Sequence, residues 1–286
     1  MTASDPAMPA RPGDAPVGPV DPDELHVMTF NLRRPADGIL QRRADRWGTR
    51  ASAVSALLRA SRPAVLALQE ALPHAMPTVR DALGYSYRGL GRGRGPGGRG
   101  EGTPLLYDST RLTVRAWRQE AVSDEPDREG SRYGGTPFPR ILVWAEFEDR
   151  RTGSTFLAIN AHLDPLSGRS RDRSIDRIHS LLRERGLPTI VLGDFNAGPR
   201  SKTLRRMLHG GLLVDAWTAA QTRRTPEWST HANYRPPRIG ARRIDGILTT
   251  TDIDVRSTAI DARRFDGVSP SDHLAVHGIL RIRGAA

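Results

Sequence analysis

The amino-acid sequence predicts an α/β fold in which two packed β-sheets are flanked by helices. Short runs of aliphatic and β-branched residues recur along the chain at the length of strands. Segments with apolar residues at helical spacing lie between several of these runs. No internal repeat or long linker divides the 286 residues. We therefore expect one domain, residues 24–283, in preference to two or three smaller ones.

The strand and helix patterns follow one another along the whole predicted domain. Strands are expected at residues 25–31, 64–70, 85–88, 101–107, 112–117, 141–147, 155–161, 187–196, 244–248, 253–260 and 274–282. Helices are expected at residues 47–58, 73–83, 171–185 and 204–208. Pro63 ends the first helix and Gly186 the third. The strands at 141–147 and 155–161 are predicted to pair as a hairpin.

Two long segments lack both patterns. Residues 88–102 alternate glycine with arginine, and we predict a mobile loop that has no means of packing. It could reach along a phosphate backbone, although a solvated surface loop is the simpler interpretation. Residues 214–243 form a long polar connection, and long loops in compact domains are often functional.

The N-terminal residues 1–23 are rich in Pro, Gly, Ala and Asp and contain no apolar signal sequence. We predict a disordered tail there. No later stretch approaches the roughly 18 to 20 apolar residues that a membrane helix needs. We therefore expect a monomer that is cytoplasmic and does not insert into membranes.

Composition favours an anionic ligand without choosing one. The net charge is +11, and of the 43 basic residues only Lys202 is a lysine. A basic surface suits phosphodiester substrates, but an arginine-rich composition is equally well explained by genomic base composition. The absence of cysteine excludes disulfides, thiolate metal ligands and a thiol nucleophile. Any metal must therefore bind oxygen or imidazole.

Polar side chains stand at the ends of five predicted strands. The stretch 187–196 ends its apolar run in Gly193, Asp194 and Asn196. The other ends carry Asn31, Glu70, His162 and the triplet Ser271-Asp272-His273. Capping of the next helix would explain Asp194 and Asn196 taken alone. One shared polar site explains all five ends, because each polar tip is costly to bury without partners and open α/β sheets bind ligands at strand ends.

These strand ends belong to six motifs: Asn31, Gln69-Glu70, Asn160-Ala161-His162, Gly193-Asp194-Phe195-Asn196, Ile244-Asp245 and Ser271-Asp272-His273. In order and spacing the motifs resemble the endonuclease/exonuclease/phosphatase superfamily, and most of all its small bacterial metal-dependent hydrolases. The resemblance covers about residues 25–282. It implies a four-layer α/β sandwich, in which two mixed sheets lie between helices.

The resemblance implies a metal site made of oxygen ligands. Glu70 is the best single candidate, Asn31 would be a neutral second contact, and Asp272 would be a further carboxylate at or near the metal. Such ligands suit Mg²⁺ or Mn²⁺. Without the resemblance, Glu70 alone is more simply a strand-end carboxylate in solvent.

The resemblance also implies roles in phosphate-ester hydrolysis, which needs an activated water and neutralised phosphoryl charge. Asp194 would orient or deprotonate the water, and Asn196 would hydrogen-bond a phosphoryl oxygen. His273 would bind the scissile phosphate. Asp245 would fix the tautomer of His273 and favour its charged form.

A second histidine pair is implied by the deoxyribonuclease-like branch of the superfamily. His162 resembles its second active-site histidine, Glu101 occupies the position of the carboxylate partner, and Arg140 matches a phosphate-contacting arginine. A lone strand-end histidine is more often structural, and only the pairing reverses this. Relatives often read His-Leu-Asp-His where this chain has Pro165 in the last place, so the contribution of that histidine is absent or replaced.

We therefore expect a Mg²⁺-dependent phosphodiesterase that acts on nucleic acid as an endonuclease or exonuclease. The alternative is a phosphatase or phosphodiesterase for a phosphoinositide or another phosphorylated small molecule, since loops choose the substrate on one scaffold. A catalytically silent phosphate-binding module is the alternative of another class. The filled polar positions argue against it.

Overall fold

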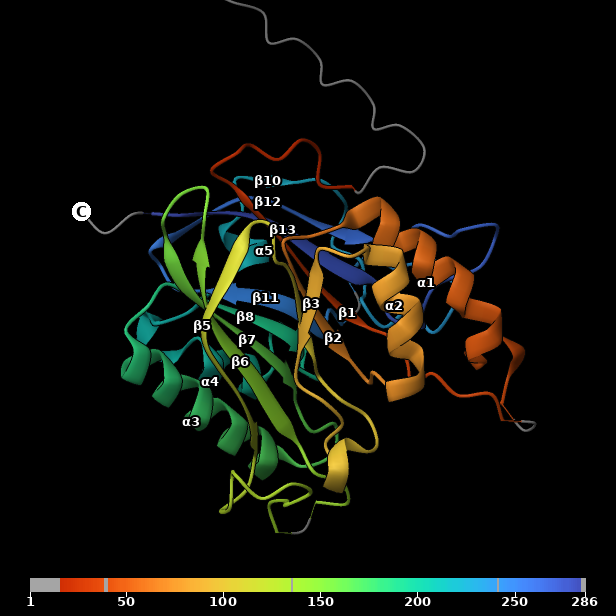
Figure 1. Cartoon of the computed structure of the whole chain (residues 1–286), viewed down its shortest axis with the longest axis horizontal. Helices are drawn as coiled ribbons and strands as arrows, with labels where there is room; N and C mark the ends of the chain where they lie inside the picture. The colour runs from red at the N-terminus through yellow and green to blue at the C-terminus, as the bar shows by residue number, and fades with distance from the viewer. Residues whose placement is uncertain (1–15, 39–40, 135, 241, 284–286) are drawn as a thin grey trace, which may run out of the picture.

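The computed structural model describes residues 16–38, 41–134, 136–240 and 242–283, and in these residues two mixed β-sheets pack face to face (Figure 1). The seven-stranded sheet has the order β10 (Thr222–Arg223), β12 (Ile253–Asp261), β13 (Ala275–Ile282), β1 (Leu25–Asn31), β2 (Val65–Gln69), β4 (Leu105–Asp108) and β3 (Tyr87–Leu90). The six-stranded sheet has the order β5 (Leu112–Ala121), β6 (Ile141–Asp149), β7 (Thr155–His162), β8 (Thr189–Asp194), β11 (Asp245–Thr249) and β9 (Val214–Asp215).

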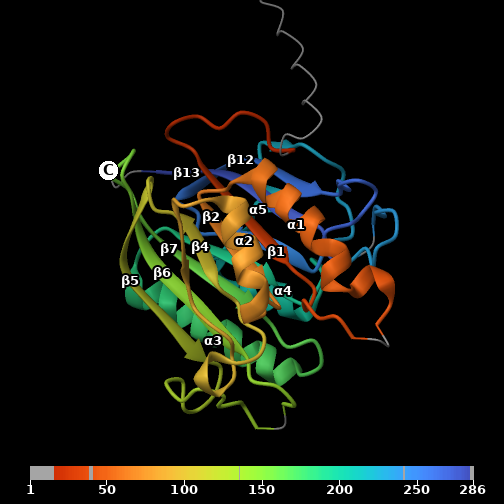
Figure 2. The ribbon, with the colours of Figure 1, turned by 45° about the vertical axis from the view of Figure 1, so that its right-hand side comes forward.

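Helices cover the outer face of each sheet (Figure 2). The seven-stranded sheet is covered by α1 (Trp47–Ser61) and α2 (Met76–Leu83), and the six-stranded sheet by α3 (Gly168–Arg185) and α4 (Lys202–Met207). A one-turn helix, α5 (Ala216–Ala219), and 3-10 turns at Arg43–Asp45, Pro73–Ala75, Pro96–Gly98 and His209–Gly211 complete the described elements. The predicted four-layer α/β sandwich is confirmed.

Three apolar clusters fill the spaces between the four layers. In β8, Ile190 and Leu192 belong to the cluster between the sheets, whereas Val191 packs in the cluster under α3 and α4. Both faces of β8 are thus covered, which explains why its sequence is a continuous apolar run instead of an alternating one. The hairpin of β6 and β7 is also confirmed, with Phe147 opposite Phe156.

Strand pairing brings the polar strand ends to one edge of the sandwich. Asn31 and Gln69 are opposite each other in the parallel pair of β1 and β2. Asp194 is opposite His162 of β7 and Asp245 of β11. Gly193 permits this pairing, because a Cβ atom there would lie 1.9 Å from the carbonyl oxygen of Ala161.

Residues 88–102 contradict the prediction of a loop that has no means of packing. Their backbone is hydrogen-bonded: Arg94 N donates to Glu101 O at 2.9 Å, and Gly102 exchanges two hydrogen bonds with Ala71 at 2.7 and 3.1 Å. Gly93 allows the close approach, because a Cβ atom there would lie 2.3 Å from a backbone oxygen. The glycines therefore allow backbone segments to pack closely against one another, and this packing orders the segment in the absence of apolar side chains.

The predicted disordered tail is wrong for the part that the structure describes. Val17 is 2% exposed and packs against Ala259 and Ile279 of β12 and β13. One apolar side chain is enough to cover apolar surface on two strands. Residues 1–15, the rest of the predicted tail, lie outside the described residues. Among the described helices, none combines the length and the apolar character required for crossing a bilayer.

Candidate active site

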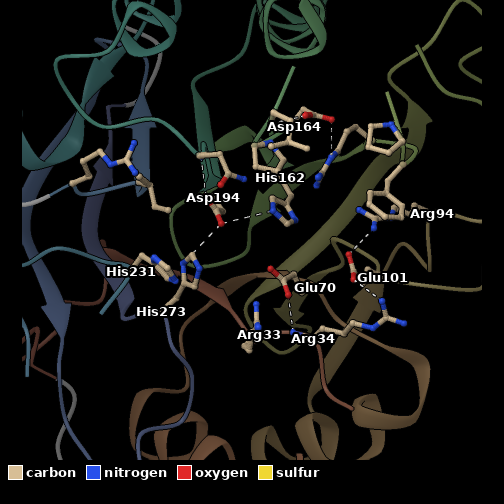
Figure 3. A pocket seen from close by; sticks show the side chains of 18 residues that line it. Arg33, Arg34, Glu70, Arg94, Glu101, His162, Asp164, Asp194, His231 and His273 are labelled. Atoms are coloured by element: carbon tan, nitrogen blue, oxygen red, sulfur yellow. Dashed lines mark hydrogen bonds and ion pairs between the residues drawn. The ribbon is translucent and has the colours of Figure 1, made fainter. Parts of the chain in front are cut away.

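A pocket opens at the polar edge of the sandwich (Figure 3). Seven of the ten predicted site residues line it: Glu70, Glu101, Arg140, His162, Asp194, Asn196 and His273. The other three, Asn31, Asp245 and Asp272, are buried behind them and at most 2% exposed. Besides Arg140, four arginines line the pocket: Arg33, Arg34, Arg94 and Arg242. Its walls therefore carry a strong positive charge beside the acidic floor.

Asn31 links the two acidic groups of the floor. Its Nδ2 donates to Glu70 Oε1 at 3.1 Å and to Asp194 Oδ2 at 3.0 Å. Glu70 Oε2 accepts a hydrogen bond from the backbone N of Arg34 at 2.7 Å. Glu70 follows β2 with a positive φ of 56°, a conformation that side chains with a Cβ rarely adopt and that is found at functional sites. The turn directs its carboxylate into the pocket.

His273 and Asp245 form the predicted pair. His273 Nδ1 donates to Asp245 Oδ2 at 2.8 Å and lies 3.8 Å from Asp194 Oδ2. Burial opposes the charged imidazole, but the carboxylates of Asp245, Asp194 and Asp272 outweigh it and raise the pKa of His273 to about 10. The imidazole is therefore a cation aimed at the pocket.

Asp194 is the buried carboxylate at the centre of the floor. Burial, and then the negative charge of Asp245, raise the pKa of Asp194 well above its usual range, against the opposing effect of His273 and of a hydrogen bond from Asn31. A carboxylate with a raised pKa is suited to accepting a proton near neutral pH.

Asn196 lies two residues beyond Asp194, and its φ of 50° is also positive. Asp194 Oδ1 accepts from the Asn196 backbone N at 2.8 Å, while Asn196 Nδ2 donates to Leu163 O at 2.8 Å. The side chain thus both lines the pocket and anchors the start of the loop after β7.

His162 does not have the partner that was predicted for it. Glu101 binds Arg94 at 2.7 Å and lies 3.6 Å from Arg34, whereas the carboxylate recorded beside His162 Nε2 is Asp194, at 3.7 Å. Burial, and then the positive charges of Arg140 and Arg94, lower the pKa of His162 well below its usual value. His162 is therefore neutral, and Glu101 belongs to an arginine cluster at the pocket wall.

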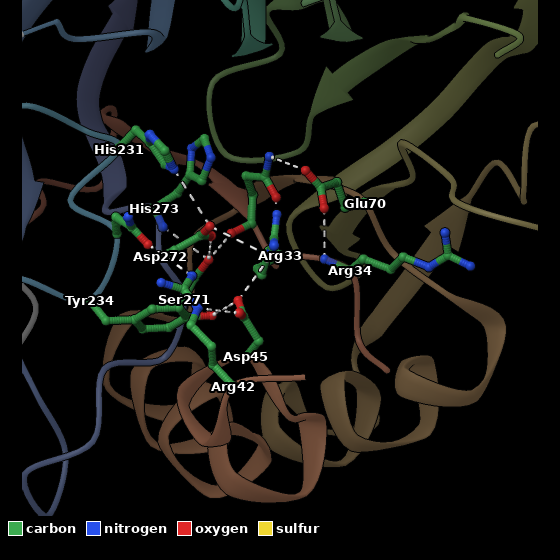
Figure 4. A network of polar contacts seen from close by, with 12 residues as sticks. Arg33, Arg34, Arg42, Asp45, Glu70, His231, Tyr234, Ser271, Asp272 and His273 are labelled. Carbon is green, nitrogen blue, oxygen red and sulfur yellow. Dashed lines mark hydrogen bonds and ion pairs between the residues drawn. The ribbon is translucent and has the colours of Figure 1, made fainter. Parts of the chain in front are cut away.

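Asp272, the third predicted metal contact, lies beside Arg33 and His231. Its Oδ2 lies 3.6 Å from Arg33 Nε and 3.6 Å from His231 Nε2 (Figure 4). Burial opposes the charged carboxylate, but the nearby His231 and the charges of His273 and Arg33 lower the pKa of Asp272 to about 2. The charge of Arg33 also interacts with Glu70, so this arginine contributes positive charge near both carboxylates.

Arg140 is buried, and its cationic donors are only partly used. Its Nε lies 3.5 Å from Asp164 Oδ2, and within the described residues neither Nε nor Nη1 has a hydrogen-bond partner. A buried guanidinium with free donors at a pocket wall is suited to binding an anion.

Sequence reasoning missed several residues of the pocket. His231 lines it, and its ring lies 4.8 Å from that of His273. His231 could have been suspected because it lies in the long polar connection at residues 214–243. Arg94 could have been suspected because it lies in the Gly/Arg segment at residues 88–102. Nothing in the sequence pattern pointed to Phe138 or Leu166, which also line the pocket.

Among the described residues, two sets of three potential ligands lie close enough to hold a cation: His231 with Asp272 and His273, and Asp194 with Asp245 and His273. The ligand atoms of each set are within 4.8 Å of one another. Of the predicted metal contacts, Asp272 belongs to the first set, whereas Glu70 belongs to neither and is hydrogen-bonded to Asn31.

Comparisons with known proteins show the family of the chain. Residues 28–273 match the family described as the Endonuclease/Exonuclease/phosphatase family. No curated protein sequence matches significantly.

Among solved structures, the endonuclease/exonuclease/phosphatase from Bacteroides vulgatus is 26% identical with a TM-score of 0.83, over 91% of this chain and 99% of that one. A mannosyl-6-phosphatase of Bacteroides thetaiotaomicron VPI-5482 is 25% identical with a TM-score of 0.79, over 90% and 99%. TDP2 from D. rerio, with a single-stranded DNA product, shares the fold at 17% identity and a TM-score of 0.64, over 90% and 98%. Family members are phosphoester hydrolases and generally depend on divalent metals. The chain therefore belongs to the endonuclease/exonuclease/phosphatase family and is a phosphoric ester hydrolase.

Proposed function

We propose that the protein is a Mg²⁺- or Mn²⁺-dependent phosphodiesterase whose preferred substrate is nucleic acid. The observation that carries this proposal is the floor of the pocket, where the His273–Asp245 pair lies at 2.8 Å beside Asp194. A cationic imidazole, a carboxylate that accepts protons and a basic wall are the groups that hydrolysis of a phosphate ester requires.

The donor set fits a hard divalent ion. Glu70 offers a carboxylate oxygen at the pocket, and carboxylate and amide oxygens are the ligands that Mg²⁺ and Mn²⁺ prefer. Asn31 directs its Nδ2 to Glu70 and Asp194, and its Oδ1 accepts a hydrogen bond from the backbone N of Arg33 at 2.8 Å. The amide of Asn31 would therefore have to rotate to offer its oxygen to the ion. Glu70 and Asn31 would hold the ion, with Asp272 nearby. When bound, a divalent ion neutralises charge on the phosphoryl group.

The other steps of hydrolysis are carried out by side chains of the protein. His273, held charged by Asp245, binds a phosphoryl oxygen. Asp194 orients the attacking water and accepts its proton. Arg140 and Asn196 stabilise the phosphoryl charge from the wall. His162, which is neutral, donates a hydrogen bond to the phosphate or to the leaving oxygen, and Glu101 acts indirectly by holding Arg94.

A phosphatase for a phosphorylated small molecule is the second candidate. The name of the B. thetaiotaomicron neighbour favours it, because a mannosyl-6-phosphatase with similar coverage is 25% identical. A silent phosphate-binding module is disfavoured, since the catalytic positions are all filled. For the chain as a whole we propose a cytoplasmic monomer with a single catalytic domain at residues 24–283, which does not insert into membranes.

A hydrolysis panel tests the proposal. Purified protein with Mg²⁺ or Mn²⁺ is given an aryl phosphodiester, single-stranded and duplex DNA with and without an abasic site, RNA, soluble inositol phosphates and mannose 6-phosphate. We expect hydrolysis of the diester and of nucleic acid, lost in His273→Ala. Turnover of phosphomonoesters alone would establish the second candidate, and metal-independent binding without turnover would establish the silent module.

A further inference from the structure

One wall of the pocket is apolar. It consists of Pro137, Phe138, Pro165 and Leu166, which we call the apolar wall, and all four line the same pocket as the catalytic groups. Phe138 is 55% exposed and Leu166 is 79% exposed. Seven large hydrophobic side chains are exposed among the described residues, and two of them meet here. Clustered exposure beside a charged site indicates ligand contact.

The two halves of the apolar wall are adjacent. In the antiparallel pair of β6 and β7, Leu142 is opposite Ala161. The two halves of the wall therefore lie on the segments that precede β6 and follow β7 at the same end of this pair. The Arg140–Asp164 ion pair at 3.5 Å joins the same two segments, each partner standing two residues or fewer from the wall.

Both halves are held in place from behind. Asp164 Oδ1 accepts hydrogen bonds from the backbone N of Leu166 at 2.8 Å and of Ser167 at 2.7 Å. The guanidinium of Arg94 lies 5.2 Å from the centre of the Phe138 ring, and Glu101 in turn binds Arg94 at 2.7 Å (Figure 3). The wall is therefore preorganised, which reduces the entropy lost on binding.

The neighbours of the wall define what it would accept. Arg94 and Arg140 supply positive charge next to it, so its ligand carries an anionic group together with a flat apolar one. The wall side chains offer no hydrogen-bond donors to sugar hydroxyls. A nucleobase has a π-face that stacks on aromatic side chains irrespective of sequence. In a duplex that face is already stacked, so an unpaired base is the fitting occupant.

We propose that the apolar wall is a subsite for an unpaired nucleobase next to the scissile phosphate. The inference rests on the proposed phosphodiesterase function and specifies its substrate as single-stranded nucleic acid. It also gives a role to Pro165, which occupies the position where relatives of the family often have a histidine. In this chain, Pro165 contributes apolar surface to the wall where the histidine would make a polar contact. Glu101 acts as a positioning residue for the wall through Arg94.

Phe138→Ala tests the subsite, with single-stranded oligonucleotides that carry one abasic site moved stepwise along the strand. Loss of one stacked base should raise KM roughly 5- to 100-fold and change kcat little. On the oligonucleotide whose abasic site falls at the wall, variant and parent should have the same KM. Phe138→Tyr should restore the parent KM. Tyr85→Ala, which changes an exposed aromatic residue outside the pocket, is the matched control.

An equal loss on intact and abasic strands, or no loss at all, would overturn the subsite while leaving the phosphodiesterase intact. If the parent hydrolysed no oligonucleotide, the proposed function would fail. Equilibrium binding of the same strands, measured by fluorescence anisotropy, would then test whether the apolar wall binds a base. Equal Kd values for parent and Phe138→Ala would refute it, and weaker binding of intact strands only would support it.

Discussion

Among the described residues, two buried histidine–carboxylate clusters can be compared, one at the pocket and one between strands. The pocket cluster consists of His273, Asp245 and Asp194. The strand cluster lies between β1, β12 and β13 and consists of His26, His277, Asp261 and Arg263. There, His26 Nε2 and His277 Nδ1 share a hydrogen bond of 3.1 Å, His277 Nε2 lies 3.6 Å from Asp261 Oδ2, and Arg263 Nη2 binds Asp261 at 2.6 Å.

The clusters differ in how their charges are compensated. In the pocket cluster two carboxylates surround one imidazole, and they raise the pKa of His273 to about 10. In the strand cluster burial, and then the charge of His277, lower the pKa of His26. Burial opposes the charged form of Asp261, yet the nearby His277 and the hydrogen-bonded Arg263 hold the pKa of Asp261 well below the usual range.

The strand cluster thus pairs its one carboxylate with a guanidinium inside the protein. The pocket cluster keeps two acidic groups and one cation at the wall of a cavity. We therefore propose that the same residue types are structural in the strand cluster and catalytic in the pocket cluster, because His273 and Asp194 line the pocket that also holds Glu70 and Arg140.

The largest effect on kcat/KM is expected from His273 of the pocket cluster, in contrast to His277 of the strand cluster. His273→Ala should lower kcat/KM roughly 100- to 10,000-fold, as removal of general acid–base and electrostatic groups usually does. The double variant with Asp245→Ala should lie within about tenfold of His273→Ala, because the pair acts as one unit. His277→Ala should leave kcat/KM within about twofold and lower thermal stability. Fully additive losses in folded proteins would show that Asp245 acts independently of His273.

Metal binding should depend on residues of the pocket and not on the strand cluster. We expect excess chelator to abolish activity, and Mg²⁺ or Mn²⁺ to restore it. Glu70→Gln should need about 10- to 100-fold more Mg²⁺ for a half-maximal thermal shift, as when a metal contact is weakened. Asp261→Asn, in the strand cluster, should titrate like the parent. Full activity in excess chelator would contradict the metal site.

A smaller effect concerns His162, which lacks a carboxylate at hydrogen-bond distance. Glu101 binds Arg94 and not this histidine, so the two should contribute independently. The loss of kcat/KM in the double variant of His162→Ala and Glu101→Ala should be within about twofold of the product of the single losses. A double variant no worse than His162→Ala would restore the predicted pairing, for instance in the substrate complex.

The smallest effect on activity is expected from Asp261→Asn, which should leave kcat/KM within about twofold at pH 7. Loss of a buried charged partner should cost about 3 kcal/mol in the free energy of unfolding. Because the folded pKa of Asp261 is lowered, its stabilisation is present above about pH 4 and is lost as the pH falls below that. Urea unfolding of parent and variant should therefore differ most near neutral pH and converge toward pH 2. A constant gap would exclude ionisation of Asp261 as the cause.

The sequence by itself determined the layers and the polar edge. The positions of strands and helices follow from apolar periodicity, which is a local property of the sequence. The position of a residue at the end of a strand then follows from how that strand pairs with its neighbours. The His273–Asp245 contact was predicted from the resemblance of the motifs to the family, and the structure has it at 2.8 Å. Boundaries shifted by a few residues where edge strands are short, as in β3, predicted at 85–88 and observed at Tyr87–Leu90.

Only the tertiary structure decided which charges pair and what lines the walls. Glu101 meets Arg94 because hydrogen-bonded backbone folds residues 88–102 into a packed loop, and His231 reaches Asp272 because a β-bridge ties it to His273. Val17 likewise packs on strands more than two hundred residues away in sequence. Such contacts depend on how loops close over the sheets. A periodic pattern records which face of a strand is apolar, but it carries no information about the path of an irregular segment.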